Sequence, residues 1–283
     1  MEPLVWSCLK ALTPPDIEVS FFDDRIEVIP SDLQVDAVAL SVETYTAKRA
    51  YNIASQFRNR GIPVIMGGFH ATAMPDEVSQ HADAVVTGDA EDLWPEVIAD
   101  LRSGSLKRFY KMQNLPDLKG TVTDRSIYEN KNYPHLSLVQ YTRGCAHACN
   151  FCSIRASYGD KLRFRTVADV IDDIKRSGKK HIFIVDDNIL GDRTHFKELL
   201  HALIPLKIRW SCQISLDVTE DDELLDLMRQ SGCFNMLAGF ESLSQDNMAQ
   251  MGKKWNMRQG PYSEQIMKIH DYGMLIYATF IFG

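Results

Sequence analysis

The chain alternates short, β-branched runs with longer helical patterns, and this alternation restricts the folds that it can adopt. In the first 104 residues, apolar runs that end in turn residues lie at 17–24, 37–42, 63–68 and 83–88. Amphipathic helical patterns lie between them, at about 45–60 and 91–103. Strands that alternate with helices form parallel sheets covered on both faces. We therefore expect a parallel α/β sheet in residues 1–104.

A second series of the same kind follows a break. Residues 105–135 are polar and interrupted by prolines, so we expect a connector between two domains. Strand patterns then resume at 136–142, 181–187, 209–216, 234–242 and 274–283. Helical patterns separate them at about 167–177, 193–203, 220–230 and 263–271. Residues 136–283 therefore predict a second α/β domain with five strands.

Composition narrows the class of protein. A chain of 283 residues with 45% apolar residues can form one large domain or two ordinary ones. The net charge of −7 argues against nucleic acid as a partner, and no apolar stretch of about 20 residues predicts a membrane span. The start of the chain does not have the pattern of a signal peptide. We expect a cytoplasmic protein with reduced cysteines.

Three of the six cysteines stand within eight positions, as C-x3-C-x2-C at Cys145, Cys149 and Cys152. They follow directly on the strand pattern 136–142, at the end of a strand where α/β proteins build their sites. Thiolate clusters suit zinc or iron–sulfur centres. A structural zinc site needs four ligands, whereas three thiolates on a four-iron cluster would leave one iron open. The residues favour iron–sulfur and leave zinc and an unligated loop open. Cys8, Cys212 and Cys233 are expected to pack as apolar residues.

The cysteine spacing, with Phe151 before the last cysteine, resembles the signature of radical S-adenosylmethionine (SAM) enzymes. The resemblance implies a 4Fe–4S cluster on the three cysteines, with SAM on the open iron. It also implies a partial TIM-type (β/α)6 barrel, of which five strands are present. Glu241, in "GFES", would contact the ribose of SAM. Asp187 and Asn188 stand where many members have G-G-E near the methionine part.

Each of these residues also has a structural interpretation. The sequence "VDDN" at 185–188 suits a strand end followed by a helix cap. Glu241 suits the first turn of a helix, and Phe151 suits simple packing.

The N-terminal part resembles the flavodoxin-like, cobalamin-binding domain that precedes the radical domain in one large group of these enzymes. The resemblance rests on residues 39–54, 61–77 and 82–104. It implies cobalamin with Ser41, Glu43, Thr44 and Tyr45 nearest its lower face. Further contacts would come from the loops after the next two strands, at Gly67, Gly68, His70, Gly88 and Glu91. The D-x-H-x-x-G segment is absent, and His70 does not replace its histidine by spacing. The alternative is a sheet with tight turns and no cofactor.

Both halves together resemble class B, cobalamin-dependent radical methyltransferases, and hopanoid methylase-like proteins in particular. The resemblance implies methylation of an unactivated carbon in a small-molecule or lipid-like substrate, with electrons from a flavodoxin or ferredoxin. We assign no catalytic side chain. Two alternatives stay open: a cobalamin-binding radical enzyme that cyclises or rearranges its substrate, and a non-catalytic cofactor-binding protein. A transfer-RNA methylthiolating enzyme is disfavoured because no basic C-terminal module is present.

The resemblance is incomplete at both ends of the sequence. The family begins with a strand where this chain begins with "PLVWSCLKAL", and the sixth barrel strand is not present. We expect a fragment, or a shortened paralogue that needs a partner.

Overall fold

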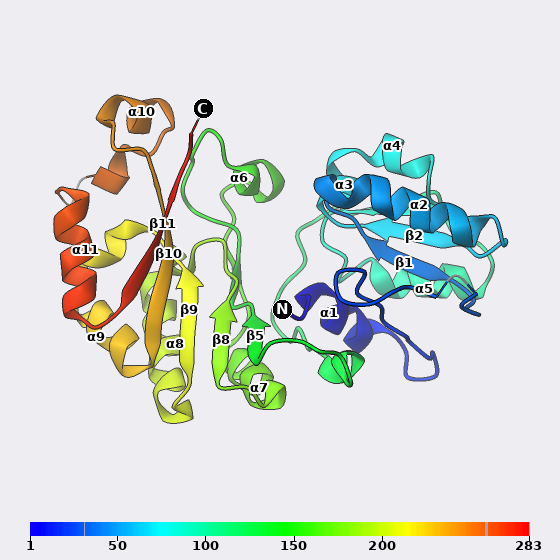
Figure 1. The fold of residues 1–283 in the computed structure, drawn as a ribbon, viewed down its shortest axis with the longest axis horizontal. Helices are drawn as coiled ribbons and strands as arrows, with labels where there is room; N and C mark the ends of the chain where they lie inside the picture. The colour runs from blue at the N-terminus through cyan, green and yellow to red at the C-terminus, as the bar shows by residue number, and fades with distance from the viewer. Residues whose placement is uncertain (31, 258–259, 283) are drawn as a thin grey trace. The chain divides into compact units, whose positions relative to one another are not determined.

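The computed structural model describes residues 1–30, 32–257 and 260–282. They form two compact units (Figure 1). The N-terminal unit holds Val5–Pro116 and Ser126–Asn132. The C-terminal unit holds Met1–Leu4, Asp117–Arg125 and the chain from Tyr133 onward. No helix among the described residues is long and apolar enough to cross a membrane.

The N-terminal unit is built on a four-stranded parallel sheet whose strands lie side by side in chain order. The strands are β1 (Val38–Ser41), β2 (Val64–Gly67), β3 (Ala84–Thr87) and β4 (Phe109–Lys111). Its helices are α1 (Leu4–Leu12), α2 (Ala47–Arg58), α3 (Phe69–Ala73), α4 (Pro75–Ser79) and α5 (Trp94–Arg102), with 3-10 turns η1 (Thr44–Thr46) and η2 (Arg125–Tyr128). Three of the predicted strands and both predicted helices are present, each within a few residues of its predicted bounds.

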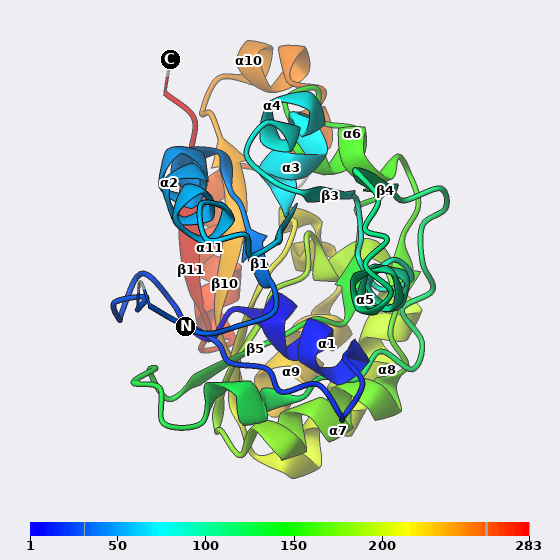
Figure 2. The same cartoon turned by 90° about the vertical axis from the view of Figure 1, so that its right-hand side faces the viewer.

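The sheet is covered on both faces, as alternating side chains require. Val64 and Met66 of β2 pack with α2, whereas Ile65, between them, packs with α5 on the other face. Figure 2 shows α2 and α5 on opposite sides of this sheet. The predicted α/β class is confirmed, and the carboxyl ends of β1, β2 and β3 share one edge.

The strand predicted at 17–24 is wrong, because these residues have no strand partner and form irregular backbone. Local contacts hold them instead. The Phe21 ring lies 5.8 Å from that of Trp6 and 5.5 Å from that of Tyr128. Asp23 is paired with Arg25 at 2.6 Å. A β-rich sequence becomes a strand only where a neighbouring backbone offers hydrogen bonds.

The stretch 105–135, predicted as a connector, contributes to both units. β4 pairs with β3, so the sheet continues past residue 104. Asp117–Arg125 belongs to the C-terminal unit, where Thr123 and Arg125 bind the fully buried Asp173. Three-residue strands and single ion pairs carry no periodic signal, so sequence patterns do not reveal them.

The C-terminal unit contains a five-stranded parallel sheet of β5 (Leu136–Val139), β8 (His181–Ile184), β9 (Arg209–Gln213), β10 (Cys233–Glu241) and β11 (Leu275–Phe280). Neighbours in the sheet are neighbours in the chain, which is the order of a barrel wall. All five predicted strands are present, although Gly283 of the last one lies outside the described residues. A separate two-stranded ribbon, β6 (Thr142–Arg143) with β7 (Arg163–Phe164), follows β5.

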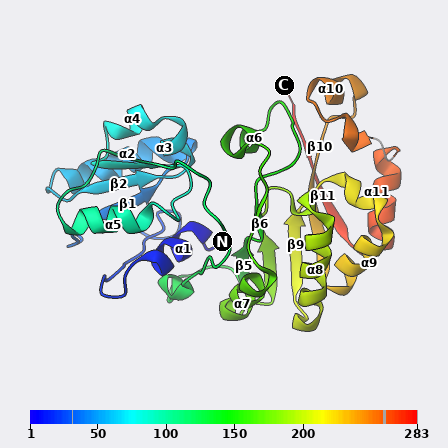
Figure 3. The ribbon, with the colours of Figure 1, turned by 180° about the vertical axis from the view of Figure 1, so that it is seen from behind.

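The main helices of this unit cover one face of the sheet (Figure 3). They are α7 (Val167–Ser177), α8 (Arg193–Leu203), α9 (Asp222–Gln230) and α11 (Tyr262–Asp271). Shorter elements are α6 (Ser153–Tyr158), α10 (Gln245–Gln250), η3 (Ile189–Gly191), η4 (Ile204–Leu206), η5 (Leu216–Glu220) and η6 (Lys254–Met257). Thr166, Asp192 and Asp221 cap α7, α8 and α9 by accepting a backbone N–H. The four long helices agree with prediction because their apolar patterns, and the caps of α7, α8 and α9, are local in the sequence.

Asp173 on α7 ties the connector to the sheet. It accepts hydrogen bonds from Thr123 at 2.6 Å, Arg125 at 3.0 Å and Arg165 at 3.0 Å. Burial alone would raise the pKa of Asp173, but the two guanidinium charges and the threonine hydroxyl hold that pKa below its usual value.

Candidate cofactor site at the cysteine loop

The three cysteines share one loop that leaves the β6 strand. Cys145, Cys149 and Cys152 are half-buried and form no disulfide. The backbone N–H of Cys152 donates to the Cys149 carbonyl at 3.2 Å, which turns the loop back on itself. Burial raises the pKa of the Cys145 and Cys149 thiols, and the nearby Cys152 raises both further. The three thiols therefore lie close enough to affect one another's charge.

The donor set fits a cluster better than a single ion. Within the described residues, no group of three or more His, Cys, Asp or Glu converges tightly enough to hold one metal ion. A four-iron cluster places each thiolate on a different iron, so its ligands need not meet at a point. Thiolates gathered by one loop suit that geometry.

Two acidic residues at the end of β8 fix the backbone that enters the loop. The fully buried Asp186 carboxylate accepts the backbone N–H groups of Tyr141, at 2.7 Å, and Thr142, at 2.9 Å, and also the Thr142 hydroxyl. Asp187 accepts the backbone N–H of Gly144 at 2.8 Å. Burial raises the pKa of Asp186 to about 7, although these hydrogen bonds act in the opposite direction.

Gly144 is required at the start of the loop. Its φ of 99° lies in the region that favours glycine, and a Cβ there would overlap the carbonyl oxygen of Lys161. Asp187, predicted to contact SAM, thus reaches the loop backbone beside Cys145.

Asn188 continues this anchoring to the first cysteine. Its Oδ1 accepts the backbone N–H of Ser215 at 3.1 Å and of Leu190 at 3.3 Å. Its Nδ2 lies 3.1 Å from the Ser215 hydroxyl and 3.9 Å from the Cys145 Sγ. Asn188 caps η3, so the interpretation of "VDDN" as a strand end with a helix cap is confirmed in part.

The far side of the loop packs on the segment after α10, which sequence analysis did not single out. The Asn150 backbone N–H donates to the Met251 carbonyl at 3.0 Å, and its side chain donates to Gln250 at 2.7 Å. The rings of His147 and Trp255 stack at 3.8 Å, nearly parallel. The sequence "MGKKWN" at 251–256 has small and aromatic residues in a polar stretch, and this was the available signal.

Glu241 ends β10 in a strained conformation. Its φ is 59°, unusual for a residue with a side chain, and the pairing of β10 with β11 shifts between Gly239 and Glu241. Its carboxylate forms a buried ion pair with Lys253, at 2.7 Å. Lys253 lowers the pKa of Cys149, against the larger effect of burial. The site therefore carries a cation that the sequence did not reveal. Phe151 lies in the loop with about half of its surface exposed.

The predicted cobalamin contacts gather at the carboxyl edge of the N-terminal sheet. Ser41, Glu43, Thr44 and Tyr45 follow β1; Gly67, Gly68 and His70 follow β2; Gly88 and Glu91 follow β3. The His70 backbone N–H donates to the Val42 carbonyl, which joins the first two loops. Gly68 has a φ of 100°, and a Cβ there would lie 2.8 Å from Val42 backbone atoms. These loops approach too closely for any other residue at this position.

His70 is buried and held within the unit. Its Nε2 lies 3.0 Å from the Tyr51 hydroxyl, which donates to Glu77 at 2.9 Å. Its Nδ1 is buried and has no hydrogen-bond partner among the described residues. Burial raises the pKa of Glu43, and the nearby His70 lowers it. The structure thus brings Glu43 and His70 together, whereas the Tyr45 ring is mostly exposed.

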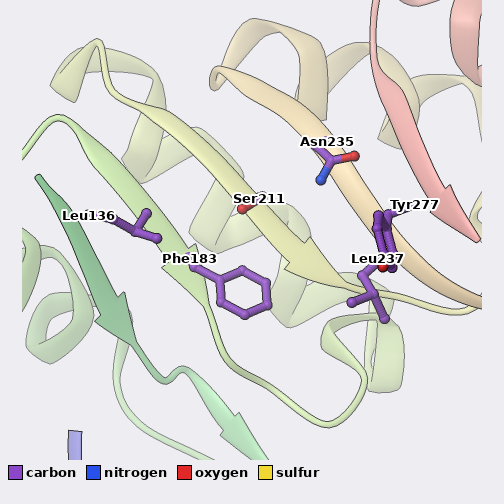
Figure 4. Close-up of a pocket in the computed structure, with 6 residues that line it drawn as sticks. All are labelled: Leu136, Phe183, Ser211, Asn235, Leu237 and Tyr277. Atoms are coloured by element: carbon purple, nitrogen blue, oxygen red, sulfur yellow. The ribbon is translucent and has the colours of Figure 1, made fainter. Parts of the chain in front are cut away.

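The inner face of the C-terminal sheet carries a pocket of about 260 Å³ (Figure 4). It is lined by one side chain or two from each strand, namely Leu136, Phe183, Ser211, Asn235, Leu237 and Tyr277. The lining is mainly apolar, with polar groups on Ser211, Asn235 and Tyr277. It lies on the face opposite to the helices, below the strand ends that carry the cysteine loop.

Comparison with known proteins decides the family of this site. The family model of the Radical SAM superfamily matches residues 139–275. Residues 139–275 are thus similar to a radical SAM domain. The match begins in β5 and contains the cysteine loop, so the predicted resemblance is confirmed.

The likeness extends over both units. The chain is 34% identical, over 99% of its length, to bacteriochlorophyllide d C-12(1)-methyltransferase of Chlorobaculum tepidum, and it covers 64% of that relative. It is 26% identical to hopanoid C-2 methylase of Rhodopseudomonas palustris, of which it covers 56%. The radical SAM methyltransferase TsrM of Kitasatospora setae has the same fold, with a TM-score of 0.72 at 15% identity over 89% of this chain and 58% of TsrM. The chain thus spans less than two thirds of the length of these proteins.

Proposed function

We propose that the chain belongs to a cobalamin-dependent radical SAM enzyme that methylates an unactivated carbon. The observation that carries the proposal is the cysteine loop at the head of a radical SAM domain, within a methyltransferase likeness that covers 99% of the chain. Once bound, a 4Fe–4S cluster supplies the electron that cleaves SAM to methionine and a 5′-deoxyadenosyl radical, and cobalamin supplies the methyl group.

The residues would divide this work by position. Cys145, Cys149 and Cys152 would hold three irons and leave the fourth open to the amino and carboxylate groups of SAM. Asp186 and Asp187 fix the backbone that presents the first cysteine. Glu241 would contact the ribose. For this contact, its carboxylate must either release Lys253 or bind Lys253 and the ribose at the same time.

The loops after β1, β2 and β3 would bind cobalamin. Glycine at 68 lets two loops meet closely, and glycine at 88 has a φ of 84°. His70 does not stand at the spacing of a D-x-H-x-x-G segment, so we propose no protein histidine as the lower cobalt ligand. Cobalamin would therefore bind with Ser41, Glu43, Thr44 and Tyr45 nearest its lower face.

The substrate would be a small, apolar or lipid-like molecule. The inner pocket supports this, because its lining is mostly carbon, with three side chains, Ser211, Asn235 and Tyr277, that carry a group able to form hydrogen bonds. A flavodoxin or ferredoxin would supply electrons, and a cytoplasmic setting would keep the thiols reduced.

The test is anaerobic incubation of the reconstituted protein with SAM labelled in its methyl group, a reductant and cobalamin. We expect 5′-deoxyadenosine and methylcobalamin from the wild type, and no 5′-deoxyadenosine from Cys149→Ala. Cys233→Ala, which removes a buried thiol outside the loop, is the control and retains both. 5′-Deoxyadenosine without transfer of the labelled methyl group to cobalamin would favour cyclisation or rearrangement. Bound cofactors without SAM cleavage would favour a non-catalytic protein.

A further inference from the structure

The side-chain amide of Asn188 is oriented by its own hydrogen bonds. An amide can usually be turned over without a visible change of shape, so its orientation must be inferred from its partners. Here the Oδ1 faces two backbone N–H groups, of Ser215 at 3.1 Å and of Leu190 at 3.3 Å. Backbone N–H groups can only donate. The oxygen must therefore face them, and the nitrogen must face the other way.

The nitrogen is directed at the first cysteine of the loop. Nδ2 carries two hydrogens, and its two partners are the Ser215 hydroxyl at 3.1 Å and the Cys145 Sγ at 3.9 Å. Asn188 is 5% exposed, so water cannot readily replace either partner. Both amide hydrogens are thus used inside the chain. This differs from the role in SAM binding that the sequence suggested for Asn188.

We propose that Asn188 is a positioning residue that donates an N–H to the Cys145 sulfur and thereby raises the reduction potential of the cluster. The inference rests on the proposed function, in which Cys145 is a cluster ligand. A hydrogen bond to a ligating sulfur stabilises the more negative, reduced cluster. It also fixes the direction in which the thiolate points.

The neighbouring charges explain why an amide stands at this position. Asp186 and Asp187 precede it, and the Asp187 carboxylate accepts the backbone N–H of Gly144, the residue before Cys145, at 2.8 Å. A third carboxylate would keep the oxygen that accepts from Ser215 and Leu190 but would place a second oxygen against the sulfur. Asparagine keeps the acceptor and supplies a donor, which the sequence D-D-N provides and D-D-D would not.

The test compares two isosteric changes of an amide to a carboxylate. Asn188→Asp removes the N–H that faces Cys145. Gln213→Glu is the matched control, because Gln213 ends the neighbouring strand β9 and donates to the Asp186 carbonyl at 3.3 Å rather than to a cysteine. Each protein is reconstituted anaerobically, its iron and sulfide are counted, and the cluster is titrated with reductant and followed by electron paramagnetic resonance.

We expect Asn188→Asp to retain its iron and to be at least tenfold harder to reduce than the wild type, a shift of about 59 mV for one electron. Gln213→Glu should shift by much less. Resonance Raman should show the iron–cysteinate stretch moving in Asn188→Asp alone. Equal potentials in the two variants, with the wild type fully loaded, would overturn the inference.

If Asn188→Asp loses its iron on reconstitution, a third variant takes its place in the comparison. Asn188→Ser is too short to reach Cys145 and is scored by the same comparison with Gln213→Glu. A wild type that binds no iron and sulfide would instead contradict the proposed function, so the two failures are distinguishable. Circular dichroism of each apoprotein shows whether a variant is folded.

Discussion

Lys253 and Glu241 form a buried ion pair at 2.7 Å, at the point where β10 leaves the sheet and opposite the cysteine loop. Both side chains are about nine-tenths buried, and Lys253 also donates to the Gly239 carbonyl at 2.8 Å. A buried carboxylate that loses its cation is left uncompensated, which is more costly than removal of the whole pair.

We therefore expect Lys253→Met to lower the free energy of unfolding by about 3–5 kcal/mol. The double variant Lys253→Met, Glu241→Gln should recover much of that loss. Urea unfolding of the apoprotein measures both. The exposed pair Arg229–Asp226 provides the control, since Arg229→Met should cost less than about 1 kcal/mol. If the double variant is no more stable than Lys253→Met, the loss of stability in Lys253→Met does not come from the unpaired carboxylate of Glu241.

Asp186 should give the stability of the protein a distinct pH dependence. Burial raises its pKa from the usual 3.8 to about 7, so the folded state binds its proton more tightly than the unfolded chain does. The stabilising contribution is therefore complete below about pH 4 and is lost as the pH rises to about 7. The full change is about 4 kcal/mol, at about 1.4 kcal/mol for each pH unit.

Asp186→Asn removes this pH-dependent contribution to stability, because an amide does not titrate. The variant should be less stable than the wild type near pH 4, because its amide keeps a single acceptor oxygen for the N–H groups of Tyr141 and Thr142. Its deficit against the wild type should shrink between pH 4 and pH 7. Unfolding in urea at several pH values measures the difference, and a deficit that does not change with pH would contradict the assignment.

Asp173 should hold the segment 117–125 on the C-terminal unit. Asp173→Ala removes the carboxylate of the buried Arg165 and leaves Arg125 its longer ion pair with Glu2, at 3.4 Å, so we expect a loss of about 3–5 kcal/mol. Limited proteolysis should then cut within 117–125. Asp172→Ala is the control, because Asp172 is exposed and pairs only with Arg176 on its own helix. Unchanged cleavage in Asp173→Ala would show that other contacts hold the segment.

Glycine at 144 should be necessary for cluster binding. Gly144→Ala places a Cβ against the Lys161 carbonyl at a φ of 99°, so the loop must shift beside Cys145. We expect most of the iron to be lost on reconstitution. Gly159→Ala also has a positive φ, 65°, but its Cβ would meet nothing within 4 Å. It should cost about 1–2 kcal/mol of strain and retain its iron. Equal iron in the two variants would contradict this role for Gly144.

The local part of the fold was predictable from sequence. Helices α7 and α8 lie at the predicted residues because each has an apolar stripe and a capping side chain at its N-terminal end. The strand predicted at 17–24 failed because a strand depends on a partner elsewhere in the chain, which "IEVSFFDD" itself does not reveal. The three cysteines were found because close spacing in one loop is visible in the sequence.

The supporting residues of the site could not be predicted in the same way. Lys253 lies 12 positions after Glu241 and meets it only because β10 and the following turn fold back. The sequence "VDDN" predicts a contact to SAM or a cap. It does not predict that the side chains of its two aspartates accept from the backbone of Tyr141, Thr142 and Gly144, more than 40 positions earlier. Long-range hydrogen bonds of this kind leave no periodic pattern.

We propose that three thiolates of one loop hold a four-iron cluster and leave one iron open. The most direct measurement is the iron and sulfide content, with Mössbauer spectra, of anaerobically reconstituted wild type and Cys149→Ala, before and after addition of SAM. We expect about four irons and four sulfides for each wild-type chain, and the loss of most of them in Cys149→Ala. In the wild type, the Mössbauer spectrum of one iron site should change on addition of SAM. Zinc in place of iron, or iron that is unaffected by Cys149→Ala, would contradict it.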